Sequence, residues 1–330
     1  MTSESPTNGH SAREPSTATG VAAFVESMRV SHWIKNGFVA VPLLFSGKYM
    51  EWEAWVSAAM AVLAFCLLAS GVYMMNDVCD VKKDRAHPVK RHRPIASGRL
   101  SPTAAILGGV GLMLIAFAVT FWVCRPSWSN GHIRPGYVLV GWTAAYLVLN
   151  LLYSFWLKRL PVVDVLLVAF GFVLRAMAGA AAIVVPISPW LIVCTLSLTL
   201  FIALTKRRSE LVELDTAQAG SVREVNRQYT PAMLEFMLIV SSSMAIITYM
   251  LYCLSVHTRL LMKSSHMIWT IPLVIYGLFR YNMLTRQTGK NDPVKVLLGD
   301  VAMWVVVAAF VVITALILQF GPRFAYILTD

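Results

Sequence analysis

Apolar runs long enough to cross a lipid bilayer recur along the whole chain. A bilayer-spanning helix needs about 20 mostly apolar residues. Hydrophobic residues make up 57% of the chain and charged residues only 14%, too few to cover the surface of a soluble protein of 330 residues. The pattern therefore predicts an all-α integral membrane protein with about nine transmembrane helices. The expected spans are 36–50, 55–75, 104–124, 137–157, 162–185, 188–205, 232–256, 267–284 and 300–320.

The cationic residues orient these spans. The net charge is +11, and most Lys and Arg residues fall in alternate loops between the apolar runs. The positive-inside rule then places the N-terminus in the cytoplasm and the C-terminus outside. Topology and anionic ligands explain this charge better than nucleic acid does. The five cysteines are scattered, without the spacing of a zinc site or a disulfide framework.

The chain divides into a short tail and one domain. Residues 1–20 are rich in Ser, Thr, Pro and Gly, so they are expected to form a disordered N-terminal tail. No long polar insertion interrupts the rest, so residues 21–330 are expected to form a single transmembrane domain. The two longest cytoplasmic loops, 76–103 and 206–231, carry most of the polar residues.

The first of these loops opens with an acidic cluster. Asp77, Asp80 and Asp84 stand at i, i+3 and i+7, and Asn76 precedes them. On a helix these carboxylates share one face and repel each other unless a cation lies among them. Oxygen ligands of this kind suit Mg²⁺, which often joins one or two carboxylates to substrate phosphates. The alternative is a solvated, charged helix end.

A basic cluster follows at once. Lys90, Arg91 and Arg93 lie in the same loop. A diphosphate bound through Mg²⁺ keeps negative charge, which these cations can neutralise. The alternative for any one of them is ordinary positive charge next to the membrane.

Together the two clusters resemble a known family. The pattern NDxxDxxxD followed by HPxKRxRPIASG is similar to the first signature of the UbiA-type superfamily of intramembrane prenyltransferases. The resemblance implies nine helices around a central cavity. It also implies that Asn76, Asp77, Asp80 and Asp84 hold Mg²⁺ and a diphosphate.

The second loop departs from the common pattern of that superfamily. Where a second DxxxD is expected, the chain has Lys206, Arg207, Arg208 and Glu210. This loop, the RVSHWIKN segment that contains Lys35, and the RQYT segment at 227–230 resemble the decaprenyl-phosphate phosphoribosyltransferase branch. The branch implies a donor with an additional phosphate, phosphoribosyl pyrophosphate (PRPP), and Glu210 as a further metal ligand. Simple topology is the alternative for the three cations.

Polar residues inside the spans predict a wet cavity. Arg175 lies deep in the fifth span, where a bare charge is costly, and shares a helical face with Asp164. The alternative is a structural pair with a neighbouring helix. Asn150 and Tyr153 lie in the fourth span, and Lys158 comes just beyond it. Members of the superfamily often have a Tyr and a Lys here with three residues between them, whereas four separate Tyr153 from Lys158.

The resemblance thus implies a Mg²⁺-dependent enzyme of the plasma membrane with its site facing the cytoplasm. It would transfer 5-phosphoribose from PRPP to a polyprenyl phosphate and release pyrophosphate, and the product would feed arabinan synthesis for the cell wall. Asp77, Asp80, Asp84 and Arg175 are the expected catalytic residues. Lys35, Asn150, Tyr153, Lys158 and the cations of both loops are expected to bind substrate. A prenyltransferase with an aromatic acceptor, a transporter and homo-oligomeric assembly remain open.

Overall fold

The computed structural model describes residues 20–124, 137–216, 228–262, 264–288, 296 and 299–320. Within them the chain forms α-helices and short 3-10 helices and no β-strand. In order these are α1 (Val21–Ser27), η1 (Val30–Val39), α2 (Val41–Phe45), α3 (Trp52–Cys79), α4 (Val81–Ala86), η2 (Lys90–His92), α5 (Pro102–Val123), α6 (Tyr137–Phe155), η4 (Leu157–Arg159), α7 (Val163–Ala182), α8 (Pro189–Thr216), α9 (Pro231–Leu254), α10 (Val256–Met262), η6 (His266–Thr270), α11 (Ile271–Thr288) and α13 (Val301–Phe320).

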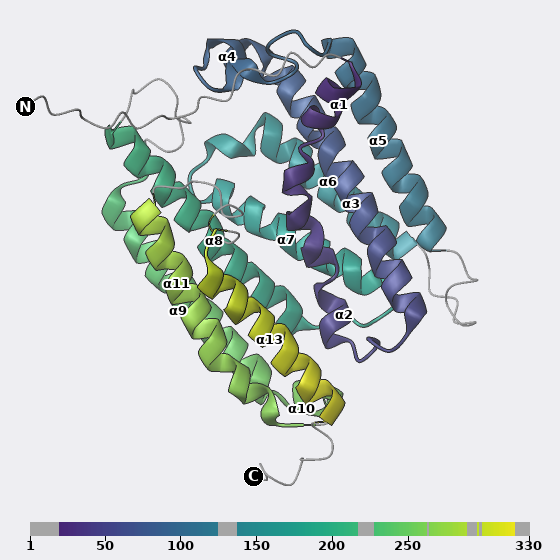
Figure 1. The fold of residues 1–330 in the computed structure, drawn as a ribbon, viewed down its shortest axis with the longest axis vertical. Coiled ribbons are helices and arrows are strands. Elements are labelled where there is room, and N and C mark those ends of the chain that lie inside the picture. The colour runs from purple at the N-terminus through teal and green to yellow at the C-terminus, as the bar shows by residue number, and fades with distance from the viewer. Residues whose placement is uncertain are drawn as a thin grey trace, which may run out of the picture.

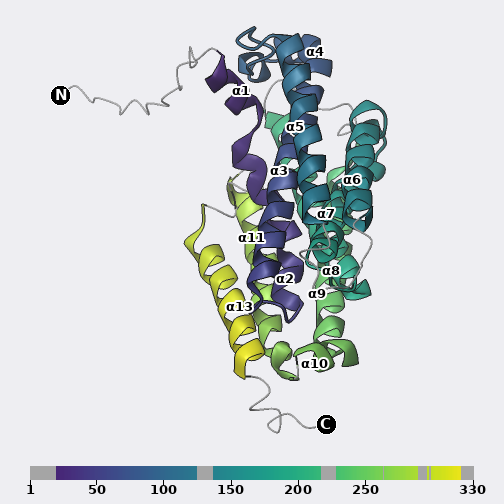
Figure 2. The ribbon, with the colours of Figure 1, turned by 90° about the vertical axis from the view of Figure 1, so that its right-hand side faces the viewer.

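The long helices run roughly side by side between two ends of the molecule. Figures 1 and 2 place α1 and α4 at one end, and α2 and α10 at the other. Seven helices in the described part are long and apolar enough to cross a membrane: α3, α5, α6, α7, α8 up to Leu211, α9 and α13. The all-α membrane class is confirmed.

The expected first span, 36–50, is wrong as a continuous helix. The chain forms the 3-10 helix η1 and then the short helix α2, which has Pro42 in its first turn. Proline lacks the N–H that a continuous helix needs and clashes with the preceding turn, so it interrupts the helix. The eighth expected span, 267–284, corresponds to η6 and α11, which is not among the seven apolar helices and carries Arg280 and Arg286.

Side-chain caps define where several helices begin. Ser101 Oγ accepts the N–H of Ala104 at the start of α5, and Thr230 Oγ1 accepts that of Met233 at the start of α9. Each cap is followed by a proline, whose missing N–H costs nothing in a first turn. Asp300 likewise accepts the N–H of Met303 at the start of α13.

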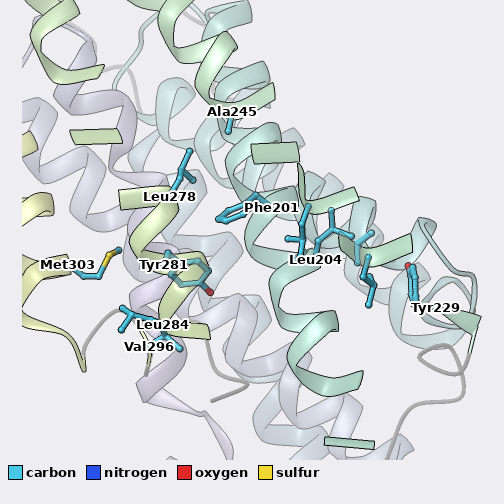
Figure 3. Packing of buried hydrophobic residues seen from close by; sticks show 13 residues of the cluster. Phe201, Leu204, Tyr229, Ala245, Leu278, Tyr281, Leu284, Val296 and Met303 are labelled. Atoms are coloured by element: carbon cyan, nitrogen blue, oxygen red, sulfur yellow. The ribbon is translucent and has the colours of Figure 1, made fainter. Parts of the chain in front are cut away.

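Two apolar cores hold the bundle together. One packs η1, α3, α5, α6 and α7, and includes Phe65, Leu68 and Tyr146. The other packs α7, α8, α9, α11 and α13. Figure 3 shows Phe201 of α8 pointing toward Tyr281 of α11, with ring centroids 6.0 Å apart. Helix α7 contributes to both cores, so it joins the two halves of the molecule.

Candidate active site

The acidic cluster lies where α3 ends and α4 follows. Asp77 and Asp84 are buried, 5% and 4% exposed, and share one guanidinium. Nη1 of Arg93 lies 3.0 Å from Asp77 Oδ1 and 2.7 Å from Asp84 Oδ2. Nη2 of Arg29 donates to the same Asp77 oxygen at 2.5 Å. Asp77 and Asp84 are thus held around a single cationic position, although the continuous helix that their spacing predicts ends at Asp80, the residue between α3 and α4.

Asp80 takes a different partner. Lys158 Nζ, on η4 after the fourth expected span, lies 3.3 Å from Asp80 Oδ2. Both side chains are partly exposed, and Asn76 is half-buried one turn earlier on α3. The ion pair brings the segment between α6 and α7 to the acidic cluster.

The donor set suits a magnesium ion that is completed by substrate. Among the described residues no group of three or more His, Cys, Asp or Glu side chains gathers closely enough to hold a metal alone. Two carboxylates nevertheless face one cationic position, now taken by Arg93. Mg²⁺ typically uses one or two carboxylates and fills its remaining positions with water and phosphate oxygens. Asp77 and Asp84 fit that use.

Glu210 belongs to a second polar cluster, on α7 and α8. Its carboxylate accepts from Arg207 Nη1 at 2.5 Å and lies 3.8 Å from Lys206 Nζ. Arg207 Nε also donates to Asp164 Oδ2 at 2.8 Å, and Asp164 is fully buried. Tyr229 donates its hydroxyl to the other Asp164 oxygen at 2.7 Å. Burial and the hydrogen bond to Asp164 raise the pKa of Tyr229, so its hydroxyl remains a donor.

Arg207 and Arg208 are engaged with other residues of the protein, and their predicted contact with substrate stays a prediction. Both are buried, and both donate hydrogen bonds to other residues of the protein. Arg208 points to α9 and α11, where it contacts Glu235 at 3.3 Å and Thr285 at 3.0 Å. Successive residues of a helix point in different directions, and of these three cations only Lys206 lines the cavity between the two halves of the bundle.

That cavity has a volume of about 960 Å³ and lies between the two halves of the bundle. Four cations line it, and no Asp or Glu of the described chain does: Arg29, Lys35, Arg175 and Lys206. Asn150 and Tyr153 line it as well, and their predicted contact with substrate stays a prediction. Asn76, the three aspartates, Lys90, Arg91, Arg93, Lys158 and Glu210 are outside its lining.

The loop cations before α5 therefore differ in role. Arg93 binds two carboxylates. Arg91 is exposed and contacts His92, with 3.2 Å between Nε and Nε2. Lys90 is half-buried. Their predicted contact with a substrate diphosphate stays a prediction.

Sequence reasoning left several residues of these clusters out of the candidate site. Arg29 precedes the first apolar run and reads as ordinary topological charge, yet it contacts Asp77. Asn36 binds Arg175 across 139 residues of sequence. Tyr229 lies in the RQYT segment, which the sequence distinguishes only by its resemblance to the phosphoribosyltransferase branch. A polar residue inside or beside an apolar run was the available signal for all three.

Comparison with known proteins settles the family. Residues 39–305 match the UbiA prenyltransferase family. The chain belongs to the UbiA prenyltransferase family. A decaprenyl-phosphate phosphoribosyltransferase from Mycolicibacterium smegmatis is 34% identical over 239 residues, 71% of each chain. One from Corynebacterium glutamicum is 30% identical over 304 residues, 91% of this chain and 88% of that one.

Solved structures of UbiA proteins share the fold. A UbiA homolog from Archaeoglobus fulgidus bound to DMAPP and Mg²⁺ superimposes with a TM-score of 0.62 and 16% identity. The match covers 93% of this chain and all of that one. The UbiA fold thus extends over almost the whole chain, and the chain is a multi-pass membrane protein.

Proposed function

We propose that this UbiA protein transfers 5-phosphoribose from PRPP to a polyprenyl phosphate, with Mg²⁺, and releases pyrophosphate. The observation that carries the proposal is the cavity, which four cations and no carboxylate of the described chain line. PRPP carries a 5-phosphate and a pyrophosphate, and the acceptor lipid carries one more phosphate. Cations at the site must balance the negative charge of these three groups. The names of the relatives from Mycolicibacterium smegmatis and Corynebacterium glutamicum support the same reaction.

The acidic residues hold the metal in this proposal. Asn76, Asp77, Asp80, Asp84 and Glu210 are the candidate ligands, and bound Mg²⁺ would supply charge that stabilises the departing pyrophosphate. Arg29, Arg93 and Lys158 already contact three of these carboxylates, so they keep the oxygens in place before substrate arrives. Lys206, on the cavity wall, is placed to bind a phosphate of the donor.

The chemistry requires few groups from the chain. The bond from C1 of the ribose to the pyrophosphate oxygen breaks, and a new bond forms from C1 to an oxygen of the lipid phosphate. The lipid phosphate is already an anion, so its attack needs no general base. The chain binds and orients both substrates, and the cavity walls keep water from C1.

The setting follows from the positive-inside rule. We place the acidic cluster and Lys206 at the cytoplasmic face of the plasma membrane, where PRPP is soluble and accessible. Residues 21–330 act as one catalytic domain in this proposal.

Turnover of purified protein in detergent tests the proposal. With Mg²⁺, PRPP and polyprenyl phosphate we expect pyrophosphate and a phosphoribosylated lipid, and EDTA should stop both. Asp80→Asn should reduce the rate at least about a hundredfold, or ~2.7 kcal/mol of transition-state stabilisation. Glu26→Gln is the matched control, because Glu26 forms an exposed ion pair with Arg99 outside the site. Turnover only with a prenyl diphosphate and an aromatic acceptor would contradict the proposed donor.

A further inference from the structure

Arg175 is a buried cation whose hydrogen bonds all go to neutral groups. Its side chain donates to Asn36 Oδ1 at 2.8 Å, the Gly171 carbonyl at 3.1 Å and the Tyr146 hydroxyl at 2.6 Å. The residue is 7% exposed, and its guanidinium lies over the rings of Tyr146 and Phe172. These contacts hold the guanidinium in place without neutralising it.

Arg207, another buried arginine, shows the contrast. Arg207 is 4% exposed and contacts two carboxylates, those of Asp164 and Glu210. A buried charge is normally paired in this way, because desolvation without a counter-ion is expensive. Within a membrane span a cation without a carboxylate partner points to a ligand that supplies the negative charge.

Arg175 lies far below the acidic cluster. Its partner Asn36 also contacts Cys66, which precedes Asp77 by eleven residues on α3. At 1.5 Å per residue this separation is roughly 16 Å along the helix. Arg175 therefore cannot share one phosphate with Asp77, and it marks a second anionic position.

The cavity wall changes character at this depth. Between the acidic end and Arg175 the lining includes Arg29, Lys35, Asn150 and Lys206. Beyond Arg175, toward the opposite end of the bundle, most of the lining is apolar: Phe38, Val41, Leu44, Phe45, Val185 and Leu191. The ligand that fits is an amphiphile with an anionic head and a long apolar tail. A sugar phosphate fits this part of the cavity poorly, because its hydroxyl groups would lose their hydrogen bonds to water against apolar walls.

We infer that Arg175, oriented by Asn36 and Tyr146, binds the phosphate of the polyprenyl phosphate acceptor, whose chain lies along the apolar half of the cavity. This inference rests on the proposed function. In this inference Arg175 binds the phosphate of the acceptor, and Lys206 binds a phosphate of the donor. The acceptor phosphate and the pyrophosphate then lie on opposite sides of C1, as a displacement at C1 requires.

Binding without turnover is the first test. The thermal midpoint of the purified protein is measured with polyprenyl phosphate, with the polyprenol of equal length and with inorganic phosphate. We expect polyprenyl phosphate to stabilise the wild type more than the other two. Arg175→Met should remove the advantage of the phosphate and leave the effect of polyprenol unchanged. An unchanged advantage in Arg175→Met would overturn the inference.

Kinetics separate the two substrates. Because the charge-assisted hydrogen bond to the phosphate is lost, Arg175→Met should raise KM for polyprenyl phosphate at least about tenfold. KM for PRPP should change by less than about twofold, whereas Lys206→Met should raise mainly KM for PRPP. An increase of KM for PRPP in Arg175→Met would assign this position to the donor and overturn the inference.

A second variant distinguishes a binding role of Arg175 from a merely structural role. Asn36→Asp is nearly isosteric and places a carboxylate 2.8 Å from Arg175 Nε, in place of the amide oxygen. The new pair should keep the fold at least as stable, while the internal anion competes with the lipid phosphate and weakens its binding. Undiminished binding would refute the inference. If the lipid binds through Arg175 but PRPP gives no product, the proposed donor fails and the acceptor site remains.

Discussion

The hydroxyl of Tyr229, in the second cytoplasmic loop (206–231), forms hydrogen bonds with residues at the start of α7. Its hydroxyl donates to buried Asp164 and accepts the N–H of Val162 at 2.6 Å. Val162 has a φ of 67°, a left-handed conformation that β-branched residues rarely adopt. Such a conformation persists when surrounding contacts hold it. One hydroxyl thus holds both the turn before α7 and the carboxylate that binds Arg207.

Tyr229→Phe should weaken this connection. The change leaves the ring in place but leaves the Val162 N–H without its acceptor and Asp164 without one donor. We expect a loss of about 1–3 kcal/mol in the free energy of unfolding, measured in detergent with denaturant. Tyr137→Phe is the control, since Tyr137 is 73% exposed, and it should change stability by less than about 0.5 kcal/mol. Equal stability of the two variants would show that the Tyr229 hydroxyl does not stabilise the fold.

At the scale of elements, glycine sets the closest helix contacts. Gly179 of α7 lies directly against the backbone of η1, where an added Cβ would overlap the carbonyl oxygen of Val39. Gly71 of α3 meets Gly109 of α5 in the same way. Small residues at such crossings let backbones approach closely, which is how helices associate where lipid removes the hydrophobic driving force. The position of η1, and with it Asn36, depends on Gly179.

Gly179→Ala should push η1 away from α7. Because the clash is with backbone, relief requires a shift of η1, and we expect a destabilisation of about 1–3 kcal/mol. The shift also moves Asn36 from Arg175. Gly141→Ala on α6 is the control, because an added Cβ there meets no atom within 4 Å and should preserve or raise the thermal midpoint. A variant Gly179→Ala as stable as wild type would contradict this close packing.

For the molecule as a whole, the polar chemistry gathers at one end of the bundle. Ion pairs link Asp80 to Lys158 and Asp164 to Arg207, so α3, η4, α7 and α8 meet there. At the opposite end contacts are mostly apolar, and Tyr49 donates to the Leu318 carbonyl at 3.3 Å. The cavity connects a charged end to an apolar one. In the proposed function this arrangement suits one water-soluble substrate and one lipid substrate.

Labelling with a membrane-impermeant maleimide tests the orientation. Single cysteines are introduced by Ser97→Cys beside α4 and Val256→Cys at α10, in a background where the natural cysteines are replaced by serine. Both positions are exposed. In intact cells Val256→Cys should react and Ser97→Cys should react only after permeabilisation. The reverse pattern would place the acidic cluster on the outer face and remove access to cytosolic PRPP.

The sequence alone determined the all-α membrane class, because a long apolar run can satisfy its backbone in lipid only as a helix. It also predicted one helical face for Asp77, Asp80 and Asp84, but the helix ends at Asp80, and only Asp77 and Asp84 meet at the guanidinium of Arg93. It was wrong about the first span, where Pro42 interrupts the helix.

Only the tertiary structure decided which cations face the cavity. Lys206, Arg207 and Arg208 are adjacent in sequence, yet one lines the cavity and two pair with Asp164 and Glu235 on other helices. The side-chain partners of Arg175 come from residues 29 and 139 positions away. A buried charge takes its role from the groups that surround it, and helix packing, which no local pattern encodes, brings those groups together.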